Sequence, residues 1–179
     1  MTFADDLTGA LGAESAIDAL RELDARSLLT AIIPELESGR GFAQPELHHY
    51  TVLEHNLAAV EAVEVASGDT AAGRELRAIL GWLDLDESLD REIEGVPVRT
   101  LLRLACLVHD VAKPHTATEM EGRLRFPRHG PTGAELMQVR LPEAGFGPLT
   151  TDFVARLVRN HLRPGVLVRP WPPTERAVR

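Results

Sequence analysis

The adjacent residues His109 and Asp110 are where chemistry is first expected in this sequence. They lie near the end of an apolar stretch, residues 101–111, and Lys113, the only lysine among 19 basic residues, follows closely. Burying an ionisable aspartate in such a stretch is costly unless the carboxylate is paired or bound to a metal. The pair therefore predicts a metal site, and the neighbouring lysine suggests a ligand that carries a phosphate.

Three other histidines could complete such a site. His55 lies on an expected helix whose residues at helical spacing are alanines, so its imidazole could reach another element. His161 lies on the apolar stripe of a second helix, and His129 precedes the helix expected to begin at Pro131. Taken singly, each is more simply explained as a surface histidine or a hydrogen-bonded core histidine.

Composition limits the chemistry and the location. The chain has 179 residues, 44% of them hydrophobic, which is enough for one compact domain. No apolar run approaches the roughly 20 residues of a membrane-crossing helix, and the first residues lack the features of a signal peptide. We therefore expect a cytoplasmic protein without a membrane partner.

Because Cys106 is the only cysteine, a metal would be held by nitrogen and oxygen ligands.

The charge is unevenly distributed along the chain. Its formal net value is −8, but residues 1–122 contain nine Lys or Arg and 23 Asp or Glu, whereas residues 123–179 contain ten Arg and four acidic residues. One interpretation is a solvated surface with uneven charge. The other is that the arginine-rich part faces a phosphate-bearing ligand.

Hydrophobic periodicity predicts an all-α fold. Expected helices cover residues 15–25, 28–36, 49–66, 71–85, 98–111, 131–140 and 151–162, with an acidic loop over 84–94 and a short β-hairpin near 116–126. The last helix is expected to stop at Pro164 and Gly165. The predicted organisation is an N-terminal helical segment and link (1–46), a main body (47–166), and a proline-rich tail with the start of an unfinished helix (167–179).

These elements resemble the HD-domain metal-dependent phosphohydrolases, in which a histidine is followed by a His-Asp pair and then by a final aspartate. His55, His109 and Asp110 match the first three positions. The final aspartate has no match, because Glu175 is the only acidic residue after His161. The resemblance implies an HD-domain helical bundle.

Five ordered segments sharpen the resemblance. Residues 29–36, 48–55, 107–114, 125–134 and 157–164 are similar to the region after the catalytic head in bacterial tRNA nucleotidyltransferases and poly(A) polymerases. The head itself, with its Gly-Ser motif and paired aspartates, has no counterpart in the sequence. Nucleotide addition is therefore not expected.

The resemblance implies a set of site residues. The expected metal ligands are His55, His109, Asp110, His129 and His161, and they would hold one or two divalent ions, manganese, iron, nickel, cobalt, zinc or magnesium. His129 and His161 would complete the site or bind a second ion, unless water replaces the missing ligand or the chain is a fragment. Asp110 and Lys113 are the expected catalytic residues, and Lys113 and Arg163 would contact the substrate phosphate.

The resulting hypothesis is a phosphohydrolase that acts on a nucleotide or on an RNA-terminal phosphate ester. Its first alternative is a noncatalytic helical module that binds RNA or a protein, although the acidic residues 1–122 do not favour nucleic-acid binding. A plain helical scaffold is the second alternative. The sequence leaves the oligomeric state open.

Overall fold

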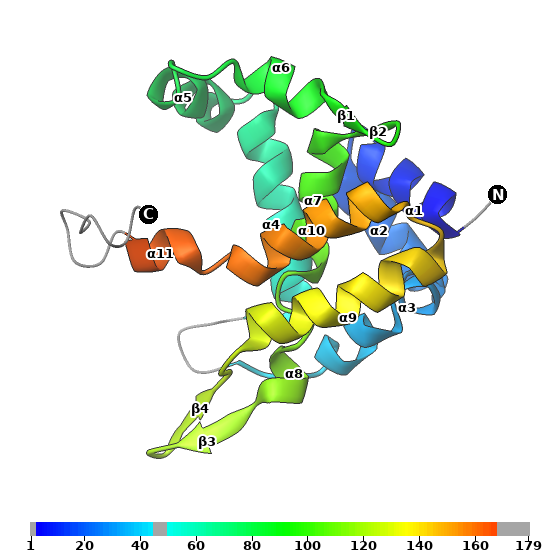
Figure 1. Cartoon of the computed structure of the whole chain (residues 1–179), viewed down its shortest axis with the longest axis vertical. Helices are drawn as coiled ribbons and strands as arrows, with labels where there is room; N and C mark the ends of the chain where they lie inside the picture. Colours follow the sequence, from blue (N-terminus) through cyan, green and yellow to red (C-terminus); the bar gives the residue numbers. More distant parts are fainter. Residues whose placement is uncertain (1–2, 45–49, 168–179) are drawn as a thin grey trace.

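The computed structural model describes residues 3–44 and 50–167, and these residues are mainly helical (Figure 1). The helices are α1 (Phe3–Gly12), α2 (Ala16–Ala25), α3 (Leu28–Ile32), the 3₁₀ helix η1 (Pro34–Gly39), α4 (Val52–Ser67), α5 (Ala71–Ile79), α6 (Leu85–Asp90), α7 (Val98–Val108), α8 (Lys113–Thr116), α9 (His129–Ala144), α10 (Pro148–Asn160) and α11 (Arg163–Leu167). Two antiparallel hairpins, β1 (Glu92–Ile93) with β2 (Val96–Pro97) and β3 (Thr118–Met120) with β4 (Arg123–Arg125), interrupt them. The expected all-α fold is confirmed.

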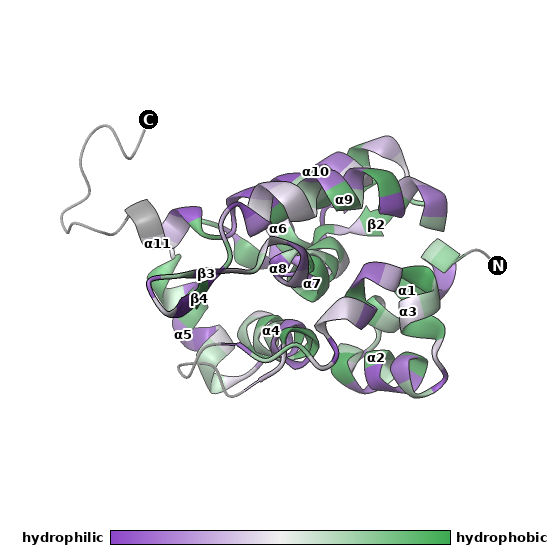
Figure 2. Cartoon of the chain, turned by 90° about the horizontal axis from the view of Figure 1, so that it is seen from below, coloured by the Kyte–Doolittle hydropathy of each residue, from purple (hydrophilic) through white to green (hydrophobic). Residues whose placement is uncertain are grey.

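Helix α7 lies at the centre of the core. Figure 2 shows it in largely hydrophobic colours between α4 and α10, which both pack against it. Leu101, Leu104 and Leu107 recur at helical spacing and are fully buried. The side chains that drive this packing therefore also fix the end of α7, where His109 and Asp110 follow.

Helices α9 and α10 pack closely against each other. A Cβ atom at Gly130 would lie 3.1 Å from the carbonyl oxygen of Arg159, and one at Gly133 would lie 3.2 Å from Val158. The missing side chains let the start of α9 approach the end of α10. This approach brings His129 and His161 to the same side of the bundle.

The N-terminal region contains one helix that the sequence did not predict, α1. Leu7 and Leu11 of α1 share the hydrophobic core with α2, α3 and α7. The helix expected over 28–36 is divided, because Pro34 lacks an N–H and begins η1 instead of continuing α3. The division of the chain at residues 46 and 166 remains a prediction.

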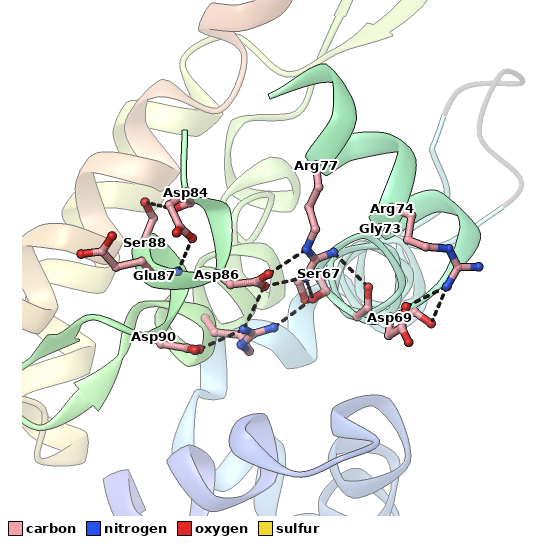
Figure 3. Close-up of polar contacts among 12 residues, drawn as sticks. Ser67, Asp69, Gly73, Arg74, Arg77, Asp84, Asp86, Glu87, Ser88 and Asp90 are labelled. Atoms are coloured by element: carbon pink, nitrogen blue, oxygen red, sulfur yellow. Dashed lines mark hydrogen bonds and ion pairs between the residues drawn. The ribbon is translucent and has the colours of Figure 1, made fainter. Parts of the chain in front are cut away.

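The acidic stretch was wrongly expected to be a loop, and the helix expected to reach residue 85 ends at Ile79. Asp84 accepts a hydrogen bond from the Glu87 amide and begins α6. In Figure 3, Arg77 of α5 lies between Asp86 and the end of α4, where it donates to the Ser67 carbonyl oxygen. This arginine holds α5 and α6 against α4.

The expected hairpin near 116–126 is confirmed as β3–β4, whereas β1–β2 was missed. In the turn of β1–β2, Glu94 has a left-handed backbone with φ 53°. Its carboxylate accepts hydrogen bonds from both the amide and the hydroxyl of Thr150, each at 2.8 Å. The missed hairpin thus holds the first turn of α10, the helix that leads to His161.

The ends of several expected helices differ from the prediction: α7 ends at Val108, α9 runs from His129 to Ala144, and α10 runs from Pro148 to Asn160. Helix α4 begins at Val52, with Thr51 as its N-cap, and not at residue 49. At Pro164 and Gly165 the chain forms α11 instead of stopping, since proline is tolerated in a first helical turn. The predicted tail and unfinished helix, from residue 168 onward, lie outside the described residues.

Within the described parts of the chain, none of the helices has the length and apolar character that would let it cross a bilayer.

Candidate metal centre

Asp110 lies in the turn after α7 and is only 2% exposed. Its oxygen Oδ2 is 3.3 Å from Nε2 of His55 and 3.2 Å from Nε2 of His109. Its other oxygen, Oδ1, is 3.2 Å from Nε2 of His129 and 3.5 Å from Nε2 of His161. One buried carboxylate therefore faces two pairs of histidines.

The five expected metal ligands come together as two groups that share Asp110. The Nε2 atoms of His55 and His109 lie 3.2 Å apart, and those of His129 and His161 lie 3.1 Å apart. In each group of two histidines and Asp110, the potential ligand atoms all lie within 4.8 Å of one another. The sequence left open whether His129 and His161 complete one site, and the geometry instead defines a second group.

Three of the histidines are oriented by the same backbone contact. In each, Nδ1 lies 2.7 Å from the carbonyl oxygen of the residue three positions earlier: Cys106 for His109, Phe126 for His129, and Val158 for His161. A carbonyl oxygen can only accept a hydrogen bond, so Nδ1 must carry the proton. Nε2 of the neutral ring is then a free ligand atom directed at Asp110.

This contact depends on where the histidines stand relative to the helices. His109 and His161 are the C-caps of α7 and α10, and both have right-handed helical backbone. His129 is the first residue of α9 and follows Arg128, whose backbone is left-handed with φ 59°. The sequence did not reveal these carbonyl partners, because every residue has a backbone oxygen and the residue type does not show which one accepts a hydrogen bond. Histidines at helix ends were the one available clue.

The charges of the cluster favour a bound cation. Burial alone would raise the pKa of Asp110, but the contacts with His109 and the other histidines outweigh it and hold the pKa below its usual range. Burial likewise opposes protonation of His129, yet Asp110 and the Phe126 carbonyl oxygen raise its pKa. Oδ1 of Asp110 accepts no well-directed hydrogen bond. Neutral imidazoles and a carboxylate in this arrangement fit a divalent transition metal.

Lys113 points at the same carboxylate. Its Nζ forms an ion pair with Oδ2 of Asp110 at 2.7 Å and donates a hydrogen bond to Oε1 of Gln44 at 2.6 Å. It also lies 5.4 Å from the ring centre of Phe126. Gln44 in turn donates to the carbonyl oxygen of Tyr50. Sequence reasoning found Lys113 but missed Gln44 and Phe126, because an isolated glutamine or phenylalanine gives no chemical signal.

Arg163 is placed differently. It begins α11, and its side chain is exposed. Across residues 3–44 and 50–167, no hydrogen bond or ion pair joins it to the histidine cluster. Its predicted contact with a substrate phosphate therefore stays a prediction.

A His-Asp pair at the end of a central helix, with histidines from three other segments, forms a cluster that could hold a metal ion in a helical domain. The HD domain family model matches residues 76–178. Because this match covers more than half of the chain, the protein belongs to the HD domain family. The matched region contains His109, Asp110, His129 and His161, whereas His55 lies before it.

Curated relatives include an A-adding tRNA nucleotidyltransferase of Deinococcus radiodurans, 30% identical over 160 residues, and a CC-adding tRNA nucleotidyltransferase of Thermus thermophilus, 31% identical over 160 residues. Each alignment covers 88% of this chain and 30% of the relative. A bifunctional uridylyltransferase/uridylyl-removing enzyme of Novosphingobium aromaticivorans is 30% identical over 165 residues, which is 89% of this chain and 15% of that protein. The chain thus spans less than a third of each relative, and the predicted similarity to tRNA nucleotidyltransferases is confirmed.

Proposed function

We propose that this protein is a metal-dependent phosphohydrolase that acts on a nucleotide or an RNA-terminal phosphate ester. The observation that carries the proposal is Asp110, a buried carboxylate shared by two histidine pairs, with the amine of Lys113 2.7 Å from the same group. Metal ligands and a fixed cation at one point can together activate water and stabilise the charge that develops when a phosphate ester is cleaved.

His55 and His109 would hold one divalent ion with Asp110, and His129 and His161 would hold the other. Ions bound there would polarise a phosphoryl oxygen and lower the pKa of a water molecule. The histidines keep their Nε2 atoms available because backbone oxygens hold the protons on Nδ1 of three of them. Asp110 balances the positive charge and keeps the two groups adjacent.

Lys113 is the proposed catalytic cation. A lysine that is 7% exposed and fixed by one ion pair and one hydrogen bond would meet a phosphoryl oxygen with little reorganisation. Its positive charge would stabilise the negative charge that moves onto the phosphoryl oxygens and the leaving group. Gln44, which accepts from Nζ, would hold the amine in position.

The names of the relatives support the substrate class. Two act as tRNA nucleotidyltransferases, and another combines uridylyltransferase and uridylyl-removing activities. All three names concern nucleotides or nucleotide-modified molecules. We transfer to this chain only the substrate class, a phosphate ester of a nucleotide or of an RNA end.

The test combines metal content with turnover. Untagged protein is analysed by elemental mass spectrometry and assayed with p-nitrophenyl phosphate, bis-p-nitrophenyl phosphate, nucleoside monophosphates and oligonucleotides with terminal phosphates. We expect one or two equivalents of transition metal and hydrolysis that is lost in Asp110→Asn. The control Asp152→Asn, in which a carboxylate of α10 that pairs with Arg156 is replaced, should keep both. Metal-loaded protein without turnover on any of these esters would reject the proposal.

One observation favours a noncatalytic module as the second candidate. In the part of the chain that the structure describes, Asp110 is the only carboxylate in the cluster, and the final aspartate of the HD signature has no counterpart. The cluster would then be a structural metal site in a protein that binds RNA or another protein. Stoichiometric metal and tight RNA binding without hydrolysis would establish this alternative.

A further inference from the structure

The arginines of the described residues fall into two groups. Most are neutralised by carboxylates: Arg21, Arg26, Arg40, Arg74, Arg77, Arg99, Arg140 and Arg156. Arg103 instead donates to two backbone carbonyl oxygens. Within residues 3–44 and 50–167, the arginines with neither kind of partner are Arg91, Arg123, Arg125, Arg128, Arg159 and Arg163. All but Arg91 belong to the C-terminal part of the chain.

Three of these unpaired arginines stand beside the metal ligands. Arg128 precedes His129, and Arg159 and Arg163 lie two residues before and after His161. All three are exposed, and we refer to them as the arginine rim. Figure 1 shows that α9 begins and α10 ends on the same side of the molecule. The arginine rim therefore lies around the side of the bundle that holds the cluster.

A pocket of about 410 Å³ adjoins the same region. It is lined by Met120, Glu121, Arg125, Phe126 and Pro127, between the β3–β4 hairpin and the start of α9. Phe126 connects the pocket to the cluster, since its carbonyl oxygen holds Nδ1 of His129 and its ring lies under Lys113. A flat apolar wall beside an exposed guanidinium is suited to a nucleobase.

We propose that the protein binds the end of a single-stranded nucleic acid, with the terminal base in this pocket and the preceding phosphates on the arginine rim. The inference rests on the proposed function and specifies its substrate as a polymer. A mononucleotide would need only the cluster and Lys113 for its phosphate. Three further arginines without carboxylate partners provide more positive charge than one phosphate ester requires, and their planar groups suit phosphate oxygens.

Charge explains why a strand end is favoured over a duplex or a protein. The hairpin also contains Glu119 and Glu121, which offset Arg123 and Arg125, so the excess positive charge belongs to the arginine rim. A base in a duplex is stacked and cannot enter the pocket without unpairing, whereas a terminal unpaired base can. A nucleotide-modified protein would place one nucleotide at the cluster and no chain of phosphates on the rim.

Binding is tested with a fluorescent single-stranded oligonucleotide that ends in a phosphate, titrated with metal-loaded protein at several salt concentrations. The test variant combines Arg128→Asn, Arg159→Gln and Arg163→Gln, with asparagine chosen because it tolerates the left-handed backbone of residue 128. We expect Kd to rise at least about tenfold, and the slope of log K against log salt to decrease by about 2, since each single-strand phosphate contact contributes about 0.7. The Kd of a nucleoside monophosphate should rise by a smaller factor than that of the oligonucleotide, because its single phosphate would meet Arg163 at most.

Arg156→Gln is the matched control, because Arg156 is exposed on the same helix as Arg159 but is paired with Asp152. It should leave the oligonucleotide Kd and the salt slope unchanged. In the pocket, Met120→Ala with Arg125→Ala should raise the Kd of both the oligonucleotide and the monophosphate. Equal losses in the control and the rim variant, equal affinity for duplex and single strand, or preference for a nucleotide-modified protein would each overturn the proposal.

The outcome is separable from that of the proposed function. Wild-type hydrolysis of p-nitrophenyl phosphate, which has neither a base nor a further phosphate, tests the phosphohydrolase alone. If this ester is cleaved but the rim variant binds the oligonucleotide like wild type, the inference fails and the function stands. If nothing is cleaved but the rim variant loses binding, the inference stands and the protein is a binding module.

Discussion

Nε2 of His129 lies 3.2 Å from Oδ1 of Asp110. The other carboxylate oxygen of Asp110 faces a different pair of histidines, so a single side chain joins two groups of candidate metal ligands. The two groups are therefore coupled through one charge. Their occupancy by metal should depend jointly on this carboxylate and separately on the histidines of each pair.

Replacing Asp110 by asparagine should remove metal from both groups. The amide keeps the size of the side chain but loses the negative charge that balances the bound cations. We expect metal affinity to fall by more than about 100-fold, because even supporting contacts of metal ligands contribute 10- to 100-fold. Elemental mass spectrometry and competition with a chelator measure the change. Retention of two metal equivalents in this variant would contradict the shared role of Asp110.

Single histidine replacements should separate the two groups. His55→Gln is expected to remove the metal bound by the group that contains His55 and His109. His161→Gln is expected to remove the metal bound by the group that contains His129 and His161. Each variant leaves the other histidine pair intact. Metal counting on both variants, with exposed His115 replaced by glutamine as the control, provides the readout. Loss of all metal in either variant would mean that the two groups form one indivisible site.

Lys113→Met should lower turnover and leave metal content unchanged. Methionine fills similar space without a charge, so the stabilisation of the phosphoryl oxygens is lost, and kcat should fall by about 100-fold or more. Gln44→Leu should lower kcat about tenfold, because it frees the amine without removing it. Steady-state kinetics with p-nitrophenyl phosphate compares the two. A Lys113→Met protein with wild-type kcat would assign the lysine to structure alone.

Metal binding should strengthen as pH rises above 6.5. The pKa of His129 is raised from its ordinary value of 6.5, because Asp110 and the Phe126 carbonyl oxygen outweigh the opposing effect of burial. In metal-free protein this protonation stabilises the fold below pH 6.5, and the contribution is lost as pH passes through the raised pKa. A metal ion must displace the same proton, so its affinity increases over this interval.

Two pH series check this prediction. The Tm of metal-free protein should fall from pH 6.5 upward, while the affinity for Mn²⁺ should rise. His129→Gln should flatten the Tm profile, since its amide does not titrate. A metal affinity that is independent of pH in wild type would show that His129 carries no proton when the metal binds.

The amino-acid sequence by itself determined the fold class and the central pair of the candidate metal site. His109 and Asp110 lie at the end of an apolar stretch that must be buried, so their chemistry could be inferred from burial cost alone. Helical periodicity located α4, α7, α9 and α10, because amphipathic spacing is a local property. Helix α1, α6 and the β1–β2 hairpin were missed, since short elements gain their stability from caps and tertiary packing rather than from their own pattern.

Only the tertiary structure placed the four histidines around one carboxylate. The sequence separates His55 from His109 by 54 residues and His129 from His161 by 32, and no local pattern relates such distant positions. The packing of α9 on α10 at Gly130 and Gly133 sets the second pair. Gln44 and the backbone oxygens that orient the imidazoles are likewise contacts of the folded chain. The residue types thus determined which functional groups the chain offers, and the packing of the helices decided which of these groups lie together.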